Sequence, residues 1–286
     1  MKPRQQGITM NIIKSLFFYI HKVFPQIPAI TQLPFGMWWV IYRDAASVTV
    51  LDNEWELAER QFMLNFLDSG MVFIDIGASY GFYTLLASSL VEPCGKVISF
   101  EPNPTVRRRL FFHVMVNRCN NVILEGIALS DSVGEREFYI VREHSDLSGF
   151  ATPVDCDYIR IIVETNTLDQ YLKQRGIYYK VDLVKVDVEG AELQVLMGSR
   201  QLLTHRPRPL WLIELLDSNT VQFGYLAVEV VKFLNNKNFL WFKITDEGYL
   251  SPMSREQTSF NNVERRNYLA IPEERIQEVK HLIQSL

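Results

Sequence analysis

The chain of 286 residues is poor in cysteine and has no surplus of positive charge. Its three cysteines, Cys94, Cys119 and Cys156, lie far apart and form no C-x-x-C pair, which argues against a disulfide framework and a zinc site and favours a reducing cytoplasm. Lys and Arg number 29 against 33 Asp and Glu, so there is no broad basic field to attract DNA or RNA. We therefore expect a protein without a nucleic-acid partner.

Long apolar runs are missing as well. The most apolar stretch, residues 8–24, is shorter than the roughly 20 apolar residues of a membrane-spanning helix. Lys14, His21 and Lys22 interrupt it, and no small-residue cleavage site of a signal peptide follows. On a helix, one face of this stretch would be apolar, formed by Ile12, Ile13, Leu16, Phe17, Ile20, Val23 and Phe24. Such a helix is expected to pack on the domain or on a second copy in a homodimer, or to lie peripherally on a membrane surface.

What the sequence does contain is a regular alternation of apolar, β-branched runs with helix-like segments. The runs predict strands at 71–76, 96–100, 122–129, 136–141, 159–163, 181–186, 210–215, 239–244 and 268–271. Helices are expected at 55–67, 82–90, 105–117, 168–174, 191–203, 226–235 and 273–285. This order is typical of an α/β fold with a doubly wound, mostly parallel sheet that helices cover on both faces.

No internal repeat or linker divides this alternating region. We therefore predict one domain of residues 54–286, preceded by an N-terminal appendage of residues 1–53. The appendage would hold the amphipathic helix and a β-hairpin or lid made of two β-rich pieces, residues 38–42 and 47–51.

The stretch from Met71 to Gly81, MVFIDIGASYG, predicts a buried strand that runs into a small-residue turn and then a helix. Such a turn lets a ligand approach the backbone beside the free N–H groups of the helix, which suits a nucleoside-bearing cofactor. Its pattern G-x-x-x-G lacks one glycine of the dinucleotide fingerprint G-x-G-x-x-G. Asp75 suits the ammonium of an amino-acid tail better than a pyrophosphate, which favours a thioether cofactor.

Acidic residues follow the ends of several predicted strands, and ligands of doubly wound sheets bind at those ends. Glu101 ends the second strand of the domain, where a carboxylate can accept both hydroxyl protons of a ribose. It would otherwise be a carboxylate that faces the start of the next helix. Asp187 and Glu189 follow the fourth central strand, and Glu214 lies near the end of the fifth.

Six runs follow one another in a characteristic order: FIDIGASYGFYTLLAS, VISFEPNP, GIALSDSVGE, TLDQYL, LVKVDVEGAELQVLMGS and PLWLIEL. In order and spacing they resemble the FkbM family of S-adenosylmethionine-dependent methyltransferases, over roughly residues 54–215. The resemblance implies the Rossmann-like class I methyltransferase fold, with a seven-stranded sheet whose last strand is antiparallel. It also implies the residues that hold the cofactor. Asp75, Gly77, Ala78, Ser79 and Gly81 would line its methionine end, Glu101 with Pro102 and Asn103 its ribose, and Ala128, Leu129 and Asp131 its adenine.

Methyl transfer to a hydroxyl is an in-line displacement that depends on positioning and benefits from a base or a metal. Asp187 is the first candidate for that base, or for orienting the hydroxyl, and Glu214 and His144 are further candidates. No metal is required by this prediction, but Asp187, Glu189 and Glu214 together would suit a divalent cation. Glu189 would otherwise cap the helix that begins at Gly190, and His144 would be an inert loop residue.

The sequence thus predicts an O-methyltransferase that uses S-adenosylmethionine to methylate a hydroxyl of a small molecule, sugar or glycan. It is expected in the cytoplasm, or peripherally at the membrane. No N-P-P-Y turn follows the fourth strand, which disfavours methylation of a nucleobase amine. Two alternatives stay open: a nicotinamide-dependent Rossmann oxidoreductase and a non-catalytic methyltransferase-like binding module. Asp75→Ala is expected to weaken cofactor binding and leave the fold intact.

Overall fold

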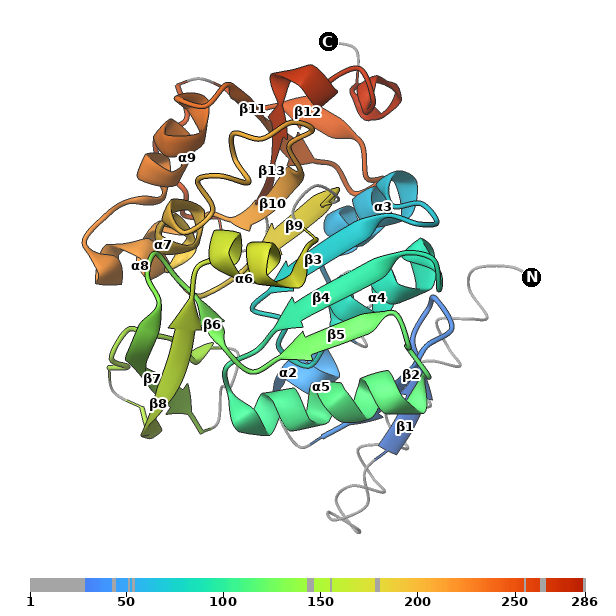
Figure 1. The fold of residues 1–286 in the computed structure, drawn as a ribbon, viewed down its shortest axis with the longest axis vertical. Coiled ribbons are helices and arrows are strands. Elements are labelled where there is room, and N and C mark those ends of the chain that lie inside the picture. Colours follow the sequence, from blue (N-terminus) through green and yellow to red (C-terminus); the bar gives the residue numbers. More distant parts are fainter. Residues whose placement is uncertain are drawn as a thin grey trace.

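The computed structural model describes residues 29–42, 45–50, 52, 55–142, 147–154, 156–177, 181–254, 256–262 and 266–284 (Figure 1). The amphipathic stretch 8–24 and the candidate His144 lie outside the described residues. In the part of the chain described, no helix has the length and apolar character needed to cross a bilayer.

A large, mostly parallel sheet forms the centre of the molecule. Its strand order is β12 (Leu250–Pro252), β11 (Phe239–Ile244), β13 (Asn267–Pro272), β10 (Leu210–Glu214), β9 (Leu183–Val186), β3 (Val72–Ile76), β4 (Lys96–Phe100) and β5 (Val122–Glu125). The neighbours from β10 to β5 pair in parallel, whereas β13 pairs antiparallel with both β10 and β11. The antiparallel last strand of the predicted fold is confirmed, and β12 is a short additional edge strand.

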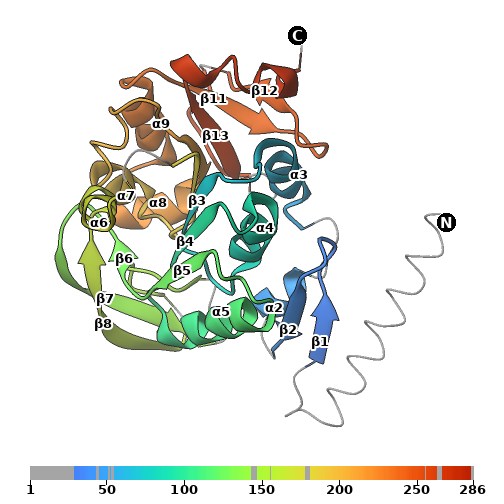
Figure 2. The same cartoon turned by 45° about the vertical axis from the view of Figure 1, so that its right-hand side comes forward.

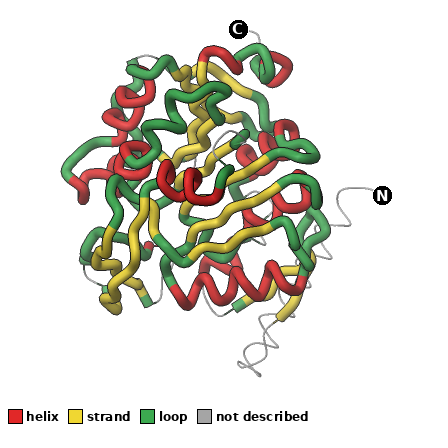
Figure 3. Tube along the Cα trace, in the orientation of Figure 1, coloured by secondary structure: helices red, strands yellow, loops and turns green. Residues whose placement is uncertain are grey.

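Helices cover both faces of this sheet (Figures 2 and 3). One hydrophobic cluster contains Phe73 of β3 and residues of α3 (Leu57–Phe66) and α4 (Phe82–Val91). The other takes Val72, Ile74 and Ile76 of the same strand with α6 (Leu168–Arg175), α7 (Glu192–Met197) and α9 (Ala227–Asn235). Alternate residues of one strand thus enter opposite cores, which explains why β3 reads as a continuous apolar run.

A second sheet lies beside the main one and has the order β6 (Ala128–Leu129), β8 (Tyr158–Asn166), β7 (Gly134–Val141). The single strand predicted at 122–129 is therefore divided, because β5 stays in the main sheet and β6 leaves it. The division occurs at Gly126, whose carbonyl accepts a hydrogen bond from Arg107 Nη1, as do the carbonyls of Glu101 and Pro102. Arg107 belongs to α5 (Pro104–Val116), which packs beside these loops.

The N-terminal region forms a hairpin, but with a different partner from the one predicted. β2 (Trp38–Ile41) pairs with β1 (Ala29–Gln32), and residues 47–49 of the second β-rich piece lie in the helix α2 (Ala45–Thr49). Ser47 explains the difference. Its hydroxyl donates to the carbonyl of Tyr42 and accepts from the N–H of Tyr42, and its own carbonyl accepts from Trp39 Nε1. These local hydrogen bonds close a tight return that overrides β propensity.

The predicted helix 273–285 is wrong. The chain there forms two 3₁₀ turns, η3 (Glu273–Arg275) and η4 (Lys280–Leu282). The N–H of Gln284 donates to the carbonyl of Leu250, and Ile283 forms a bridge to the same residue. Pairing with the edge strand β12 therefore ends the helical conformation.

A short helix, α8 (Asp217–Thr220), and the 3₁₀ turn η2 (Val221–Phe223) follow β10.

Candidate functional site

A cavity of about 250 Å³ lies at the carboxyl ends of β3, β4 and β9. Its floor is formed by the turns that follow these three strands. Trp39 of the hairpin and Trp55, just before α3, contribute to one wall. Phe138 and Phe150, of the small sheet and its loop, form another. The position is the one expected for the ligand site of a doubly wound sheet.

The turn after β3 is held against two neighbouring strands. Gly77 N and Ala78 N both donate to the carbonyl of Phe100, at 3.1 and 3.0 Å. Gly77 has φ 82°, and a Cβ there would lie 1.8 Å from the carbonyl oxygen of Asp187. Only glycine therefore permits this contact between the turn and the end of β9. Gly77, Ala78 and Ser79 line the cavity, and their predicted contact with the methionine end of the cofactor stays a prediction.

Gly81 and Asp75 lie behind the cavity lining. A Cβ on Gly81 would meet Leu110 Cδ1 at 2.1 Å, so this glycine serves the packing of α4 on α5. Asp75 is fully buried and accepts a hydrogen bond from Thr84 at 2.7 Å. Burial raises the pKa of Asp75, against the opposing charge of Lys185. The predicted cofactor contact of Asp75 stays a prediction.

Glu101 lies at the cavity with both carboxylate oxygens bound to backbone N–H groups. Oε2 accepts from Ser79 N at 2.9 Å and Oε1 from Asn103 N at 2.8 Å. Burial raises the pKa of Glu101 to about 7, although these two hydrogen bonds act in the other direction. Each oxygen retains a second lone pair, so the carboxylate can still accept from the two hydroxyls of a diol.

The predicted adenine and ribose residues divide into two groups. Pro102, Ala128 and Leu129 line the cavity, together with Phe100 and Ile127, which gives this end an apolar character. Asn103 and Asp131 do not line it.

The side chains of these two residues are engaged locally. Asn103 caps α5, since its Oδ1 accepts from Thr105 N and Val106 N. Asp131 is exposed and accepts from the hydroxyls of Ser130 and Ser132.

On the opposite side of the cavity, Asp187 is paired with a buried lysine. Lys185 Nζ lies 2.7 Å from Asp187 Oδ2, and the lysine side chain is 3% exposed. Burial acts to raise the pKa of Asp187, but the positive charges of Lys185 and Arg266 outweigh it and hold the pKa below its usual value. Asp187 therefore stays ionised at neutral pH and offers a hydrogen-bond acceptor to the cavity.

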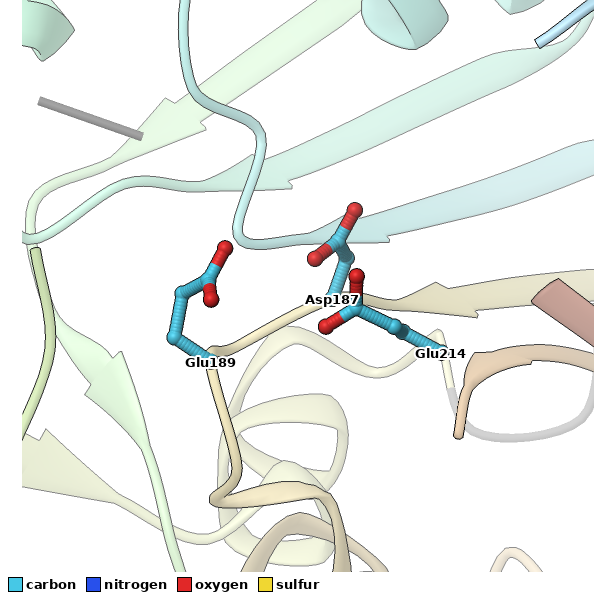
Figure 4. A group of neighbouring side chains, drawn as sticks. All are labelled: Asp187, Glu189 and Glu214. Carbon is cyan, nitrogen blue, oxygen red and sulfur yellow. The ribbon is translucent and has the colours of Figure 1, made fainter. Parts of the chain in front are cut away.

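Three carboxylates come together at the ends of β9 and β10, as predicted (Figure 4). Oxygens of Asp187, Glu189 and Glu214 lie within 4.8 Å of one another. Asn219 Nδ2 donates to Glu189 Oε2 at 2.8 Å and to Glu214 Oε2 at 3.3 Å. Arg266 Nε forms an ion pair with Glu214 Oε1 at 3.1 Å, in a geometry that is not a hydrogen bond.

Burial raises the pKa of Glu214 well above its usual value, and the negative charges of Asp187 and Glu189 add to this effect. Glu214 lies behind the lining, whereas Asp187, Glu189 and Arg266 face the cavity. Lys185 and Arg266 already supply positive charge to the cluster. Whether the three acids hold a divalent cation stays a prediction.

Glu189 is not the cap of α7. It has φ 53°, a left-handed conformation that is unusual outside glycine, and it binds Asn219 instead. Glu192, the first residue of α7, instead binds the preceding turn, because its Oε1 accepts from Val188 N at 3.2 Å and from Gly190 N at 3.1 Å.

Several residues of the cavity did not emerge from the sequence as site residues. Lys185 interrupts the apolar strand LVKV, and this charge in a buried strand is a signal that could have identified it. Its Nζ lies 4.7 Å from the centroid of Tyr83, whose hydroxyl donates to Glu56 Oε2. Arg266 had no local signal, since its acidic partners come from distant segments of the chain.

Glu56 adds a further carboxylate to this side, and burial raises its pKa. Its Oε1 lies 3.9 Å from Arg266 Nη2, which links the start of α3 to the loop before β13. A cationic group of a ligand would find three acids here, Glu56, Asp187 and Glu189.

Comparison with known proteins identifies the family. The model of the methyltransferase FkbM domain matches residues 75–241, more than half of the chain. The chain belongs to the FkbM methyltransferase family. The matched residues include the turn after β3, Glu101 and the acids that follow β9 and β10, so the predicted membership and the α/β class I methyltransferase fold are confirmed.

Individual proteins resemble the chain more distantly. The AMB antimetabolite synthetase AmbE of Pseudomonas aeruginosa is 27% identical over 162 residues, which are 44% of this chain and 8% of the synthetase. The chain therefore corresponds to a small fraction of that relative.

Among solved structures, the fold is similar to fibrillarin of Aeropyrum pernix, crystallised with natively bound S-adenosyl-L-methionine. The TM-score is 0.42 at 12% identity, and the match covers 86% of this chain and 83% of fibrillarin. Precorrin-6y C5,15-methyltransferase of Geobacter metallireducens is similar too, with a TM-score of 0.42 and 15% identity over 75% of this chain and 87% of that enzyme.

Proposed function

We propose that this FkbM family member is an S-adenosylmethionine-dependent O-methyltransferase that acts on a hydroxyl of a small molecule, sugar or glycan. The observation that carries the proposal is the arrangement of the cavity. A backbone turn and a diol acceptor, Glu101, face an ionised acceptor, Asp187, across a space of about 250 Å³.

The residues present fit the proposed cofactor. At Gly77 the turn packs so closely on the end of β9 that no side chain fits there, which leaves its backbone at the cavity. Glu101 has lone pairs for the ribose hydroxyls. An apolar place for the adenine is formed by Phe100, Ile127 and Leu129. The acids around Glu56 and Asp187 suit an ammonium group. When bound, S-adenosylmethionine supplies an electrophilic methyl group on a sulfonium.

Asp187 would orient the acceptor hydroxyl by accepting its hydrogen bond. A carboxylate with a lowered pKa is a weak base towards an ordinary alcohol. However, the hydroxyl proton becomes strongly acidic as the new C–O bond forms, so a weak base then suffices to take it. Glu214 would act from behind, by holding Arg266 next to Asp187. His144 stays a prediction without structural support.

Lys185 contributes by keeping Asp187 ionised and fixed. Its ammonium group is buried and lies at hydrogen-bond distance from Asp187 Oδ2. Precise placement of the hydroxyl is the main requirement of an in-line displacement, so a rigid acceptor is an advantage. Lys185 is therefore proposed as a positioning residue and not as a group that touches the substrate.

Two measurements test the proposal. In calorimetric titrations the protein is expected to bind S-adenosylmethionine and its demethylated product. Binding of NAD without either of these would support the oxidoreductase alternative instead.

A labelled-methyl screen against a broad panel of hydroxyl compounds is expected to reveal methyl transfer. Cofactor binding without transfer to any compound would favour the non-catalytic binding module.

A further inference from the structure

One surface away from the cavity is both apolar and basic. The end of α5 lies beside the β1–β2 hairpin in both views of the fold (Figures 1 and 2). Asn117 fixes this contact, because its Oδ1 accepts from Trp38 N at 2.7 Å and its Nδ2 donates to Trp38 O at 2.8 Å. Together the two elements expose an apolar surface, here called the α5–hairpin patch: Ile30, Trp38, Phe111, Phe112, Met115 and Val116.

The side chains of the α5–hairpin patch are exposed by 38% to 59%. On α5, Phe111, Phe112, Met115 and Val116 are neighbours at i+3 and i+4 spacing, and exposed apolar residues that adjoin one another in this way mark a binding surface. The opposite side of the hairpin is buried: Trp39 is fully covered and stacks on His113, with ring centroids 4.1 Å apart. The fold therefore does not need the exposed members of the patch for its own core.

The charge around the patch is segregated from that of the rest of the chain. Residues 102–124, which contain α5, carry four arginines and no acid, and the described hairpin residues 29–42 carry no charged side chain. All 33 Asp and Glu lie outside these two segments, together with the remaining 25 Lys and Arg. Within α5, Arg107 and Arg109 bind loops and aromatic rings, whereas Arg108 is exposed, as is Arg118 just beyond the helix.

We propose that the α5–hairpin patch docks on the surface of an anionic lipid bilayer. An anionic bilayer is negative at its headgroups and apolar beneath them. It therefore complements a surface on which exposed arginines lie beside aromatic side chains. Trp38 is of the residue type that favours the membrane–water interface. A second copy of the chain, or its own basic stretch 8–24, would bring like charges together. The proposal concerns a site outside the cavity and goes beyond the proposed function.

The small sheet provides a matched control surface. Ile162 on β8 is 59% exposed, as is Met115 on α5. On the same face of the small sheet as Ile162, one exposed arginine, Arg160, is outnumbered by three exposed acids: Glu135, Glu137 and Glu164. Ile162 and Met115 are equally exposed but differ in the charge around them. If any exposed apolar residue promoted binding, both positions would matter; if the site is specific for anionic lipid, only Met115 would.

The test is co-sedimentation of the full chain with phosphatidylcholine vesicles, with and without phosphatidylserine. Wild type and Ile162→Glu are expected to bind the anionic vesicles equally and to lose binding as salt is added. Met115→Glu and Phe112→Glu are each expected to weaken binding by about tenfold or more, and Arg108→Glu by a smaller factor. Glutamate is a good helix former, so these exposed substitutions leave α5 folded, which circular dichroism checks.

Failure of the wild type to bind anionic vesicles would overturn the proposal. So would binding that Met115→Glu and Phe112→Glu leave unchanged, because the contact would then lie elsewhere, for instance in residues 8–24. Sedimentation equilibrium without lipid tests the alternative that a second copy of the chain binds this surface. A dimer that Met115→Glu converts to a monomer would assign the α5–hairpin patch to a second copy of the chain and contradict the lipid site.

Discussion

The two sides of the cavity stabilise buried acids in different ways. On the loop side, formed by the turn 77–79 and Glu101, the carboxylate has only neutral backbone donors, and burial raises its pKa to about 7. On the charged side, formed by Lys185, Asp187 and Arg266, two cations hold the pKa of an acid below its usual value. Burial acts upward on both acids. The charges of Lys185 and Arg266 outweigh it at Asp187, whereas the two backbone donors and the charge of Arg107 do not outweigh it at Glu101.

This difference matches two tasks. An acid of near-neutral pKa can exchange its proton when a polar ligand arrives, whereas an acid paired with a buried cation keeps its charge and its position. Variants that remove the acids, or the groups that surround them, therefore test whether the two sides of the cavity differ in this way.

The largest effect is expected for Asp187→Asn. Loss of the ionised acceptor should slow methyl transfer by about 10²- to 10⁴-fold, the usual range for a group that handles the reacting proton. Single-turnover assays with labelled methyl measure this step, and calorimetry with the demethylated cofactor reports binding separately. Glu137→Gln, at an exposed ion pair on the small sheet, is the control and should retain full activity. A wild-type rate for Asp187→Asn would remove Asp187 from the mechanism.

Lys185→Met should strongly destabilise the protein. It leaves the buried Asp75 and the partly buried Asp187 without their nearest cation, and removing one partner of a buried pair costs about 3–5 kcal/mol. Urea unfolding measures the loss.

The matched control for this variant is Arg160→Met, whose pair with Glu137 is exposed and should contribute less than about 1 kcal/mol. Adding Asp187→Asn to Lys185→Met should restore part of the stability. If the double variant were as unstable as the sum of the two single ones, the two residues would be energetically independent and the comparison would fail.

Gly77→Ala tests the contact that joins the two sides. Both Gly77 and Gly70 have positive φ, 82° and 88°, so alanine at either position costs about 1–2 kcal/mol. At Gly77 the new Cβ also meets the backbone of Asp187, which should add about 1–3 kcal/mol of overpacking. Nothing lies within 4 Å of a Cβ at Gly70, which makes Gly70→Ala the control. Equal losses in thermal unfolding would show that the sides are not held together at Gly77.

The smallest effect is a change in pH dependence on the loop side. The pKa of Glu101 is raised from 4.5 to about 7 by folding, so the folded state binds more protons than the unfolded state between these values. The contribution to stability is therefore complete below pH 4.5 and is lost as the pH rises through about 7. Glu101→Gln should flatten the decline by up to about 1.4 kcal/mol per pH unit.

Urea unfolding of Glu101→Gln and wild type across this pH range measures the difference. Asp131→Asn, at an exposed acid, serves as the control and should follow the wild type. Parallel curves for Glu101→Gln and wild type would mean that Glu101 is already ionised in the folded protein. The loop side would then not differ from the charged side.

Elements with a local sequence signal formed where they were predicted. The β3 turn and the strand ends that carry Glu101 and Asp187 follow from apolar runs and neighbouring glycines, and these elements formed where predicted. The helix expected at 273–285 did not form, because its end pairs with β12, which lies far away in the chain. The β-rich piece 47–51 did not pair with β2, because the side-chain hydrogen bonds of Ser47, although short in range, do not show in a pattern of β-branched residues. Lys185 carried a readable signal as a charge in a buried strand, whereas Arg266 carried none.

By itself the sequence determined the alternation of strands and helices around the main sheet, the family, and the position of acids at the strand ends, because periodicity and covalent order are local properties of the chain. Only the tertiary structure decided which of those acids reach the cavity and which are ionised. Asp75 and Glu101 read alike in sequence, yet one is enclosed behind α4 and the other faces the cavity. Asp187 obtains its charge state from Lys185 beside it and Arg266 far along the chain, since burial and counter-charge arise only when distant segments pack together.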